Sequence, residues 1–271
     1  MGTLTRTWDL IQESVEILLA DKEILLFPLL SVLMLVVVDG PILLPLRSHL
    51  HEPPTPQEMY PMLFLLYSGS FFVIIFFNSA LMACANIRLS GGDPTLGDGF
   101  RFAWENVERI LLWSLIAATV GILLRMLEHS RVLRWVVGPV LEVGWSLATF
   151  FIIPVIIFED LDVLDSFKRS VDLFKRRWGE EVTSNFSFSV LFSLLALPGM
   201  MVGVTSVRQF SSVVGVVVAA LYLALLYVVS TALQGIFVVA LYRCATDGSE
   251  GFNPRLIHGA FSTRPGLDSG R

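Results

Sequence analysis

The stretch from Phe76 to Phe100, FFNSALMACANIRLSGGDPTLGDGF, decides the fold of this chain. Its apolar run ends at Arg88, and glycines follow at positions 91 and 92. Glycine just after a last helical turn favours the left-handed conformation that ends a helix. Thr95 and Asp98 then have the spacing of a capping box, which begins a new helix. The stretch therefore predicts the end of a membrane-spanning helix, a turn, and the start of a second helix.

The same stretch holds four of the chain's 20 glycines, as a phosphate-binding loop could. A phosphate-binding loop, however, follows a β-strand and ends in Gly-Lys-Ser or Gly-Lys-Thr, which supplies a lysine and a magnesium ligand. Here the glycines follow an apolar run, and no lysine comes after them within the stretch. A turn is the favoured interpretation, and no nucleotide or other cofactor is predicted.

The composition is that of a membrane protein. Hydrophobic residues make up 54% of the 271 residues and charged residues only 16%, with a mean hydropathy of +0.70. A helix needs about 20 apolar residues to cross a bilayer. Six runs approach this length and predict an all-α integral membrane protein with six transmembrane helices, at about 24–46, 60–87, 109–126, 135–158, 184–206 and 212–242. The polar start of the chain lacks the features of a cleavable signal, so we expect the first span to be retained.

The charges predict an orientation. The net charge of −5 gives no general basic field, so nucleic-acid binding is not expected. With the amino terminus inside, 14 of the 19 lysines and arginines fall on the cytoplasmic side and five on the other side. Cytoplasmic loops carry such an excess, and both termini are therefore expected to be cytoplasmic.

The organisation is predicted to be a threefold repeat of one unit, an amphipathic interfacial helix followed by a transmembrane hairpin. Apolar residues recur at helical spacing before each odd-numbered span, which predicts interfacial helices at about 4–20, 95–108 and 166–178. The second and sixth spans can also be aligned so that Arg88 matches Arg243, with a turn after each. We expect a single transmembrane domain over 1–258 and a cytoplasmic tail over 259–271.

Four stretches carry a family resemblance: SVEILLADKEILLFPLL, FFNSALMACANIRLSGGDPTLGDGF, WSLATFFIIPVIIFED and SFKRSVDLFKRRWGE. They resemble an uncharacterised prokaryotic family of six-span integral membrane proteins of unknown function. The resemblance covers nearly the whole chain, from about Thr7 to Phe261. More distantly, the layout is similar to YciC-type inner-membrane proteins and to the membrane domain of some glycerophosphodiester phosphodiesterases. The resemblance implies a prokaryotic cytoplasmic (inner) membrane and brings no catalytic residues with it.

Three polar residues within the predicted spans form a candidate polar path. Asn78 and Gln234 stand ten and nine residues before the aligned arginines, which places two amides at similar depth. Glu142 lies roughly 10 Å into the fourth span at 1.5 Å per residue. Two other interpretations stay open: amides at mid-membrane commonly bond neighbouring helices, and Glu142 could pair with an arginine of the preceding hairpin, at 125, 131 or 134.

The last predicted interfacial helix is strongly basic. Near an anionic membrane surface each lysine or arginine contributes about 1 kcal/mol to binding. Five residues are therefore candidate lipid-headgroup contacts: Lys168, Arg169, Lys175, Arg176 and Arg177. The expected partners are membrane lipids, including anionic headgroups.

Small residues indicate close helix packing. Gly199 and Gly203, four residues apart in the fifth span, let helix backbones approach each other, and residues 68–70 offer a second surface of this kind. These glycines are candidate helix-packing residues, either within one protomer or in a homo-oligomer.

Little in the sequence indicates catalysis. Cys84 and Cys244 are expected to be packing residues, and His49 with His51 is too weak a signal for a metal site. No nucleophile, base and acid can be placed at one depth, so we predict no enzyme, metal or cofactor. The favoured function is a non-enzymatic membrane scaffold or accessory subunit, which could bind partner membrane proteins. The alternatives are a channel or transporter-like protein and, less favoured, a lipid-active enzyme.

Overall fold

A computed structural model describes residues 14–15, 17–19, 21–44, 56–128, 141–178 and 212–246. Helices and short connections make up these residues, and no strand occurs among them. The helices are η1 (Lys22–Leu25), α2 (Leu26–Leu43), α3 (Pro56–Leu89), α4 (Leu96–Glu105), α5 (Val107–Glu128), α7 (Ile152–Phe158), α8 (Val163–Trp178) and α10 (Ser212–Thr246). A further helical segment covers 141–148. The prediction of an all-α chain is confirmed for the described residues.

Within this part of the chain, five stretches are long and apolar enough to cross a membrane: Lys22–Leu43, Met59–Leu89, Val107–Arg125, Leu141–Phe158 and Ala220–Thr246. They coincide with five of the six predicted spans, including the short third one. The predicted fifth span, 184–206, lies outside the described residues, as do the tail 259–271 and most of the predicted interfacial helix 4–20.

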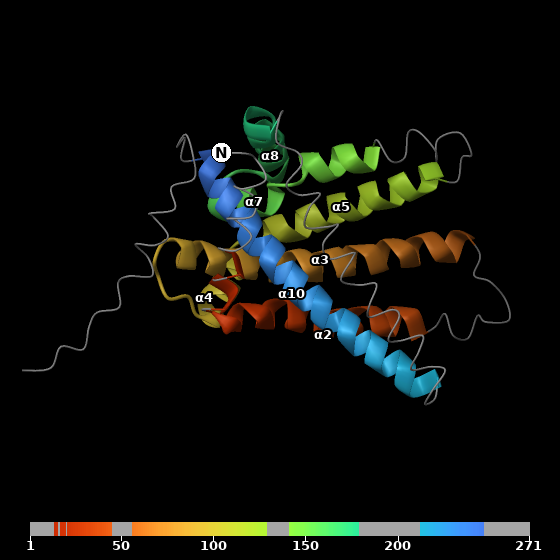
Figure 1. Cartoon of the computed structure of the whole chain (residues 1–271). Helices are drawn as coiled ribbons and strands as arrows, with labels where there is room; N and C mark the ends of the chain where they lie inside the picture. Colours follow the sequence, from red (N-terminus) through yellow and green to blue (C-terminus); the bar gives the residue numbers. More distant parts are fainter. Residues whose placement is uncertain are drawn as a thin grey trace, which may run out of the picture.

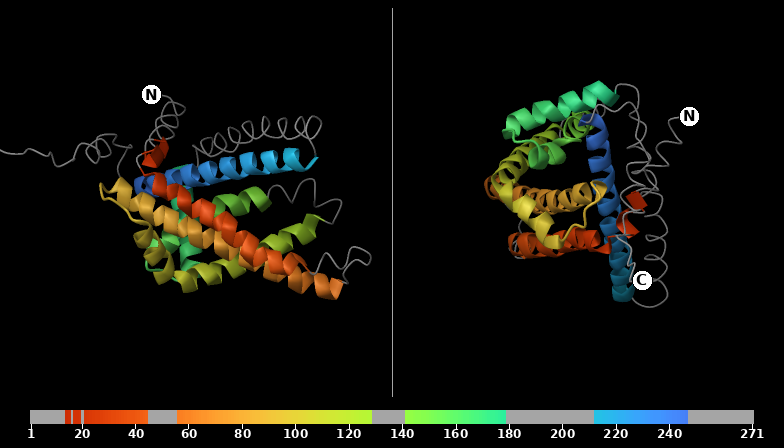
Figure 2. Two further views of the ribbon diagram at one scale, coloured as in Figure 1. Left: turned by 90° about the horizontal axis from the view of Figure 1, so that it is seen from below. Right: turned by 90° about the vertical axis from the view of Figure 1, so that its left-hand side faces the viewer.

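α3 is the central helix. It packs against α2, α4, α5, α7 and α10. Figure 1 shows α2 and α5 on either side of it, with α10 crossing at an angle. α8 is seen nearly end on in Figure 1 and lengthwise in the right-hand view of Figure 2, so it runs across the bundle rather than along it.

The buried core lies toward one end of the bundle. Its fully buried side chains come from five helices: Phe27, Leu81, Ile110, Ile156 and Phe237. Charged residues lie beside this core, at what we call the polar end, and they include Asp21, Arg88, Asp160 and Arg243.

At the other end of the same helices, large apolar side chains are exposed. They include Leu44, Tyr60, Leu123, Leu141 and Leu221. We call this the apolar end. An apolar surface of this extent is what lipid would cover in a membrane-spanning bundle.

Close packing at the polar end depends on glycine. A Cβ added at Gly99 of α4 would lie 2.7 Å from the Ala80 carbonyl oxygen, and equally close to the Cys84 sulfur and the Phe27 ring. Gly235 of α10 approaches Leu81 in the same way. Only glycine lets α4 and α10 lie this close to α3.

The fourth span is interrupted near its end. The helical segment 141–148 stops, three non-helical residues follow, and α7 begins at Ile152. Pro154 explains the position of this break. Proline has no N–H to donate and is accommodated best in the first turn of a helix, where Pro154 lies.

Two predicted boundaries were wrong by a few residues. The interfacial helix 95–108 was expected to run to the start of the third span, but α4 ends at Glu105 and α5 begins at Val107. The reason is Asn106, whose backbone leaves the helical region and whose side chain donates to the Phe102 carbonyl (3.0 Å). The helix predicted at 166–178 begins earlier, at Val163.

Candidate functional site

The turn after α3 forms as the sequence predicts. Gly91 has a φ of 83°, the left-handed conformation that glycine adopts readily. Its N–H donates to the Arg88 carbonyl (2.9 Å), and the Gly92 N–H donates to the Ile87 carbonyl (3.0 Å). This pair of bonds is a Schellman motif, which satisfies the last carbonyls of α3. Because both glycine N–H groups bond within the turn, the geometry is that of a helix end and not of a phosphate-binding loop.

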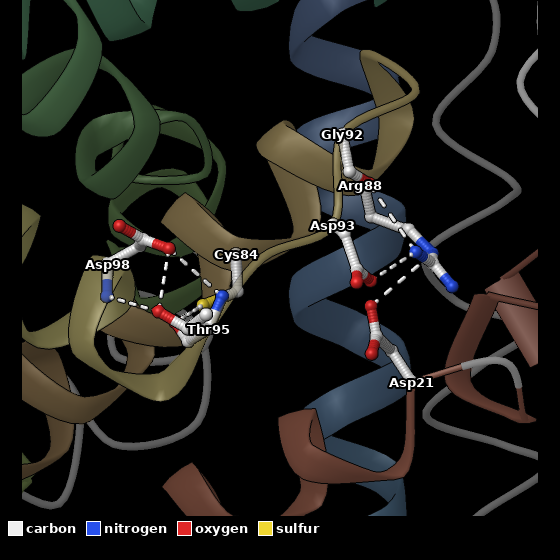
Figure 3. Close-up of polar contacts among 7 residues, drawn as sticks. All are labelled: Asp21, Cys84, Arg88, Gly92, Asp93, Thr95 and Asp98. Carbon is white, nitrogen blue, oxygen red and sulfur yellow. Dashed lines mark hydrogen bonds and ion pairs between the residues drawn. The ribbon is translucent and has the colours of Figure 1, made fainter.

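The predicted capping box is confirmed at the start of α4 (Figure 3). The Asp98 N–H donates to Thr95 Oγ1 (3.2 Å), while the Thr95 N–H donates to the Asp98 carboxylate (3.0 Å). The Thr95 hydroxyl also donates to that carboxylate (2.7 Å). These two bonds from Thr95, the hydroxyl first, hold the pKa of the exposed Asp98 below its usual value of 3.8.

Arg88 joins three segments at the polar end (Figure 3). Its Nε lies 3.3 Å from Oδ2 of Asp21, which precedes η1, and its Nη1 lies 2.9 Å from Oδ1 of Asp93, in the turn. Arg88 and Asp21 are largely buried, whereas the Asp93 side chain is 91% exposed. The Asp21 contact is an ion pair without a hydrogen bond, since neither Nε nor Oδ2 has a hydrogen-bond partner among the described residues.

The surroundings of Asp21 disfavour the charged form of its carboxyl group. Burial raises the pKa of its carboxyl above the usual 3.8, and the neighbouring Arg88 charge opposes the rise. A buried ion pair adds little net stability, but removal of one partner leaves an uncompensated buried charge. Arg88 therefore holds the start of the first span against the end of the second.

Arg243 connects α10 to the end of α3. Its Nη1 donates to Ser90 Oγ (2.9 Å) and to the Asn86 carbonyl (3.4 Å). Arg88 and Arg243, which the sequence alignment of the second and sixth spans matches, therefore lie at the same end of neighbouring helices.

Glu159 forms a second centre of the network, just after α7. Arg169 of α8 donates from Nε to both carboxylate oxygens (3.2 and 3.0 Å), and the Tyr242 hydroxyl of α10 donates to Oε1 (3.0 Å). The next residue, Asp160, pairs with Arg109 of α5. These contacts join four helices at the polar end.

Ser170 of α8 supports the break in the fourth span. Its hydroxyl donates to the Ala148 carbonyl (2.8 Å) and accepts from the Phe151 N–H (3.2 Å). Non-helical backbone at membrane depth is tolerated only where protein supplies such partners. Since Ser170 is fully buried, it is the group that satisfies both ends of the break.

The apolar face of α8 packs on protein. Phe167 stacks on Trp113 and Trp145 with ring centroids 6.0 and 5.8 Å away, and Phe174 meets the Phe150 ring edge to face at 6.4 Å. The two tryptophans stack on each other as well (5.7 Å). This aromatic cluster attaches α8 to the third and fourth spans.

Two of the five candidate lipid-headgroup contacts are paired with acidic residues. Lys168 lies 2.7 Å from Asp165, whose hydrogen bond raises the pKa of the lysine above 10.5, and Arg169 is engaged by Glu159. Lys175 is exposed. The side chains of Arg176 and Arg177 lie outside the described part of the structure.

The candidate polar path is not assembled among the described residues. Asn78 is half-buried on α3, whereas Gln234 on α10 and Glu142 at the start of the fourth span are exposed, and no hydrogen bond joins any two of them there. Arg125, one of the predicted partners of Glu142, lies instead over the Tyr67 ring at 5.5 Å.

The candidate packing glycines Gly199 and Gly203 lie outside the described residues. In the second small-residue surface, a Cβ at Gly69 would lie 2.9 Å from Val38 of α2. That surface is therefore used for packing within the protomer.

Sequence reasoning missed Asp21, Ser170 and Tyr242, and it also missed a contact between Asp39 and Ser70. Each pairs with a residue on another helix, so local spacing carried no signal for the pairing. For Asp21 and Asp39 the sequence did hold a signal: burial of a carboxylate beside or within an apolar run costs free energy, so such a residue needs a partner.

Among the described residues no group of three or more His, Cys, Asp or Glu could hold a metal ion. Cys84 is buried and donates its S–H to the Thr95 carbonyl (3.4 Å), as expected of a packing residue. The contacts of the polar end join helices to one another.

The fold and this network define an all-helical membrane protein whose polar end is held together by side-chain contacts. The chain belongs to DUF6159, a family of unknown function whose model matches residues 58–252. This confirms the resemblance to an uncharacterised family, whereas the more distant similarities to YciC-type proteins and to the phosphodiesterase-linked membrane domain have no support here. No curated protein and no solved structure matches the chain.

Proposed function

We propose that this protein is a non-enzymatic membrane scaffold or accessory subunit of the prokaryotic inner membrane, with lipid-contacting interfacial helices. The observation that carries the proposal is the placement of α8. This helix runs across the bundle at the polar end, buries Ser166, Ser170 and Leu173, and exposes Lys168 and Lys175. A helix in this position can meet lipid headgroups or a partner protein with its exposed face.

α4 supports the same proposal. Trp104 of α4 is 69% exposed, and Leu111 and Leu112 of α5 are exposed as well. Arg101 and Glu105, also on α4, are exposed charged residues. Tryptophan is enriched at membrane–water interfaces because its ring is apolar and its N–H is polar. α4 then lies where the apolar band of the bundle ends.

Six spans in three repeats, with both termini cytoplasmic, form part of the proposal. The common position of Arg88 and Arg243 at the polar end supports the repeat. A span at 184–206 is supported by the connection it would make, because α8 lies at the polar end while α10 begins at the apolar end. The polar end would then face the cytoplasm.

Lipid binding tests the scaffold proposal. The protein is placed in nanodiscs of mixed neutral and anionic phospholipid, and the lipids that it retains are identified by native mass spectrometry. Replacement of Lys175, Arg176 and Arg177 by alanine should reduce the enrichment of anionic lipid, by about fivefold per residue at about 1 kcal/mol each. The matched control replaces three cations of the carboxyl-terminal region, at 255, 264 and 271. Equal enrichment in both variants would count against lipid contact by α8.

A channel or transporter-like protein is the alternative, with a polar path near Asn78, Gln234 and Glu142. The interrupted fourth span favours it, since transporters bind substrates at broken helices. Flux across vesicles containing the purified protein separates the two functions. Ion or solute flux that falls when Asn78 or Gln234 is replaced by leucine would establish the alternative, and flux equal to that of empty vesicles supports the scaffold.

A further inference from the structure

Gln234 places an exposed amide in the middle of a membrane-spanning stretch. It lies 14 residues after Ala220 and 12 before Thr246, the ends of the apolar stretch on α10. Its side chain is exposed, and no hydrogen bond reaches it from any of the described residues. The hydrocarbon of a bilayer holds no water that could bond this amide, so its exposure to lipid is costly.

The exposure follows one line along α10. Leu233, Gly235 and Ile236, the neighbours of Gln234 in the chain, are all buried. Tyr227 and Leu223 are 38% and 39% exposed. They precede Gln234 by seven and eleven residues, about two and three turns, so all three side chains lie on the same face of the helix. We call this face the Gln234 line.

α10 lies where a further helix can reach it. It packs on α2, α3, α7 and α8, and in the left-hand view of Figure 2 most of the described bundle lies on one side of it. Asn78 of α3, the amide predicted at similar depth, is half-buried and does not bond Gln234. The Gln234 line therefore has no polar partner in the described part of its own chain.

A second copy of the chain supplies a partner at the required depth. Two copies that insert in the same direction carry every residue at the same depth, and a two-fold axis along the membrane normal brings one surface against itself. An amide has both a donor and an acceptor, so Gln234 and the partner subunit's Gln234 can satisfy each other. We propose that the Gln234 line is the interface of a homodimer in which two α10 helices pack in parallel.

The rest of the line suits helix pairing. Apolar residues four and seven apart form the seam along which two parallel helices pack, and Leu223 and Tyr227 have the first of these spacings. Ala220, one turn before Leu223, is exposed and small, so the two backbones can approach closely there. This interface goes beyond the proposed scaffold function and does not depend on it.

Association in vesicles tests the interface. The full-length protein, with one fluorophore at its amino terminus, is diluted into neutral phospholipid, and photobleaching steps give the dimer fraction at each protein-to-lipid ratio. Gln234→Leu should raise the dissociation constant of the dimer by at least about fivefold. The matched control Asn78→Leu removes the other amide at similar depth and should leave this constant unchanged. A monomeric wild type at every ratio, an unaffected Gln234→Leu dimer, or equal weakening by both variants would overturn the proposal.

Crosslinking tests the same face while Gln234 stays in place. Cys84 and Cys244 are first replaced by alanine, and Tyr227→Cys is then added and oxidised in vesicles. It should give a disulfide-linked dimer. Leu225→Cys is the control, since Leu225 is 65% exposed but lies two and a half turns from Gln234, on the opposite face. A dimer from Leu225→Cys alone would place the contact on another face. No dimer from either variant, as expected if the predicted span 184–206 covers the Gln234 line, would also overturn the proposal.

Discussion

α3 passes through both ends of the molecule, and its surroundings differ sharply between them. At the polar end Ala80, Leu81 and Ala85 are completely buried, whereas at the apolar end Phe64 and Leu65 of the same helix are exposed. Lipid is as apolar as leucine, so burial of apolar surface does not hold helices together in a membrane. Small residues and polar contacts do. The polar end has both.

The sequence of α3 explains the contrast. Its second half carries Ser79, Ala80, Ala83 and Ala85, which let neighbouring helices approach. Its first half carries the exposed Tyr60, Phe64 and Leu65, and the close approach there is at Gly69, against Val38 of α2. Ion pairs and hydrogen bonds join the helices only after this close approach, through Arg88, Glu159 and Arg243. Residue size therefore determines where the bundle closes, and charge determines which helices meet there.

The largest expected difference between the ends comes from glycine. Gly99→Ala places a Cβ within 2.7 Å of three atoms, one of them a backbone oxygen, and should lower the free energy of unfolding by about 3 kcal/mol. Gly144→Ala, where a Cβ meets nothing within 4 Å, should instead raise it by up to about 1 kcal/mol through helix propensity. Thermal unfolding in detergent measures both. Equal changes in the free energy of unfolding at the two positions would mean that the helices are packed equally loosely at both ends.

Removal of a cation should also act differently at the two ends. Arg88→Met leaves the carboxylate of Asp21 buried without its partner and should cost about 2 kcal/mol, less than for a fully buried pair because both side chains retain some exposure. Arg125→Met at the apolar end removes a cation–π contact with Tyr67 and should cost about 0.5–1 kcal/mol. Chemical denaturation of the two variants compares them. A larger loss of unfolding free energy for Arg125→Met would contradict the role of Arg88 in holding the start of the first span against the end of the second.

Ser170 should matter more than an exposed serine. Ser170→Ala removes the partner of the Ala148 carbonyl and of the Phe151 N–H, and should cost about 1–3 kcal/mol. Ser230→Ala removes a bond from the hydroxyl to the Tyr227 carbonyl of its own helix and should change stability by less than about 0.5 kcal/mol. Hydrogen exchange should show faster exchange at 149–151 in the first variant alone. If exchange there is unchanged, Ser170 does not support the break.

The smallest expected effect concerns pH. Burial raises the folded-state pKa of Asp21, so the folded protein binds this proton more tightly than the unfolded chain does. The free energy of unfolding should therefore fall as the pH rises from 3.8 through the raised pKa, and Asp21→Asn should remove this slope. Asp98, with a lowered pKa, should show the opposite sign, contributing stability that is lost as the pH falls through that pKa. Melting temperatures measured from pH 3 to 7 distinguish the contributions of the two carboxyl groups. Contributions of equal sign would contradict the raised pKa of Asp21.

Much of the fold was predictable because its signals are local. The described spans follow from runs of apolar residues, the Schellman turn from Gly91-Gly92, and the cap of α4 from the Thr95 and Asp98 spacing. The candidate site was less predictable. Their charge predicts that Lys168 and Arg169 contact lipid. Lys168 instead pairs with Asp165, one turn earlier on α8, and Arg169 pairs with Glu159, whose position depends on how α7 meets α8.

Hydropathy and capping act within a few residues, so the sequence alone indicates which of the described segments are helical and where the chain turns between them. The sequence also shows which family the protein belongs to. The tertiary structure is needed to see that Asp21 meets Arg88, that Ser170 bonds the break in the fourth span, and that Asp39 meets Ser70. A membrane-spanning helix is apolar on every side, so its pattern does not indicate which face another helix will cover. Its partners are decided by the fit of small residues and by the cost of an unpaired polar group, and both depend on the neighbouring helices.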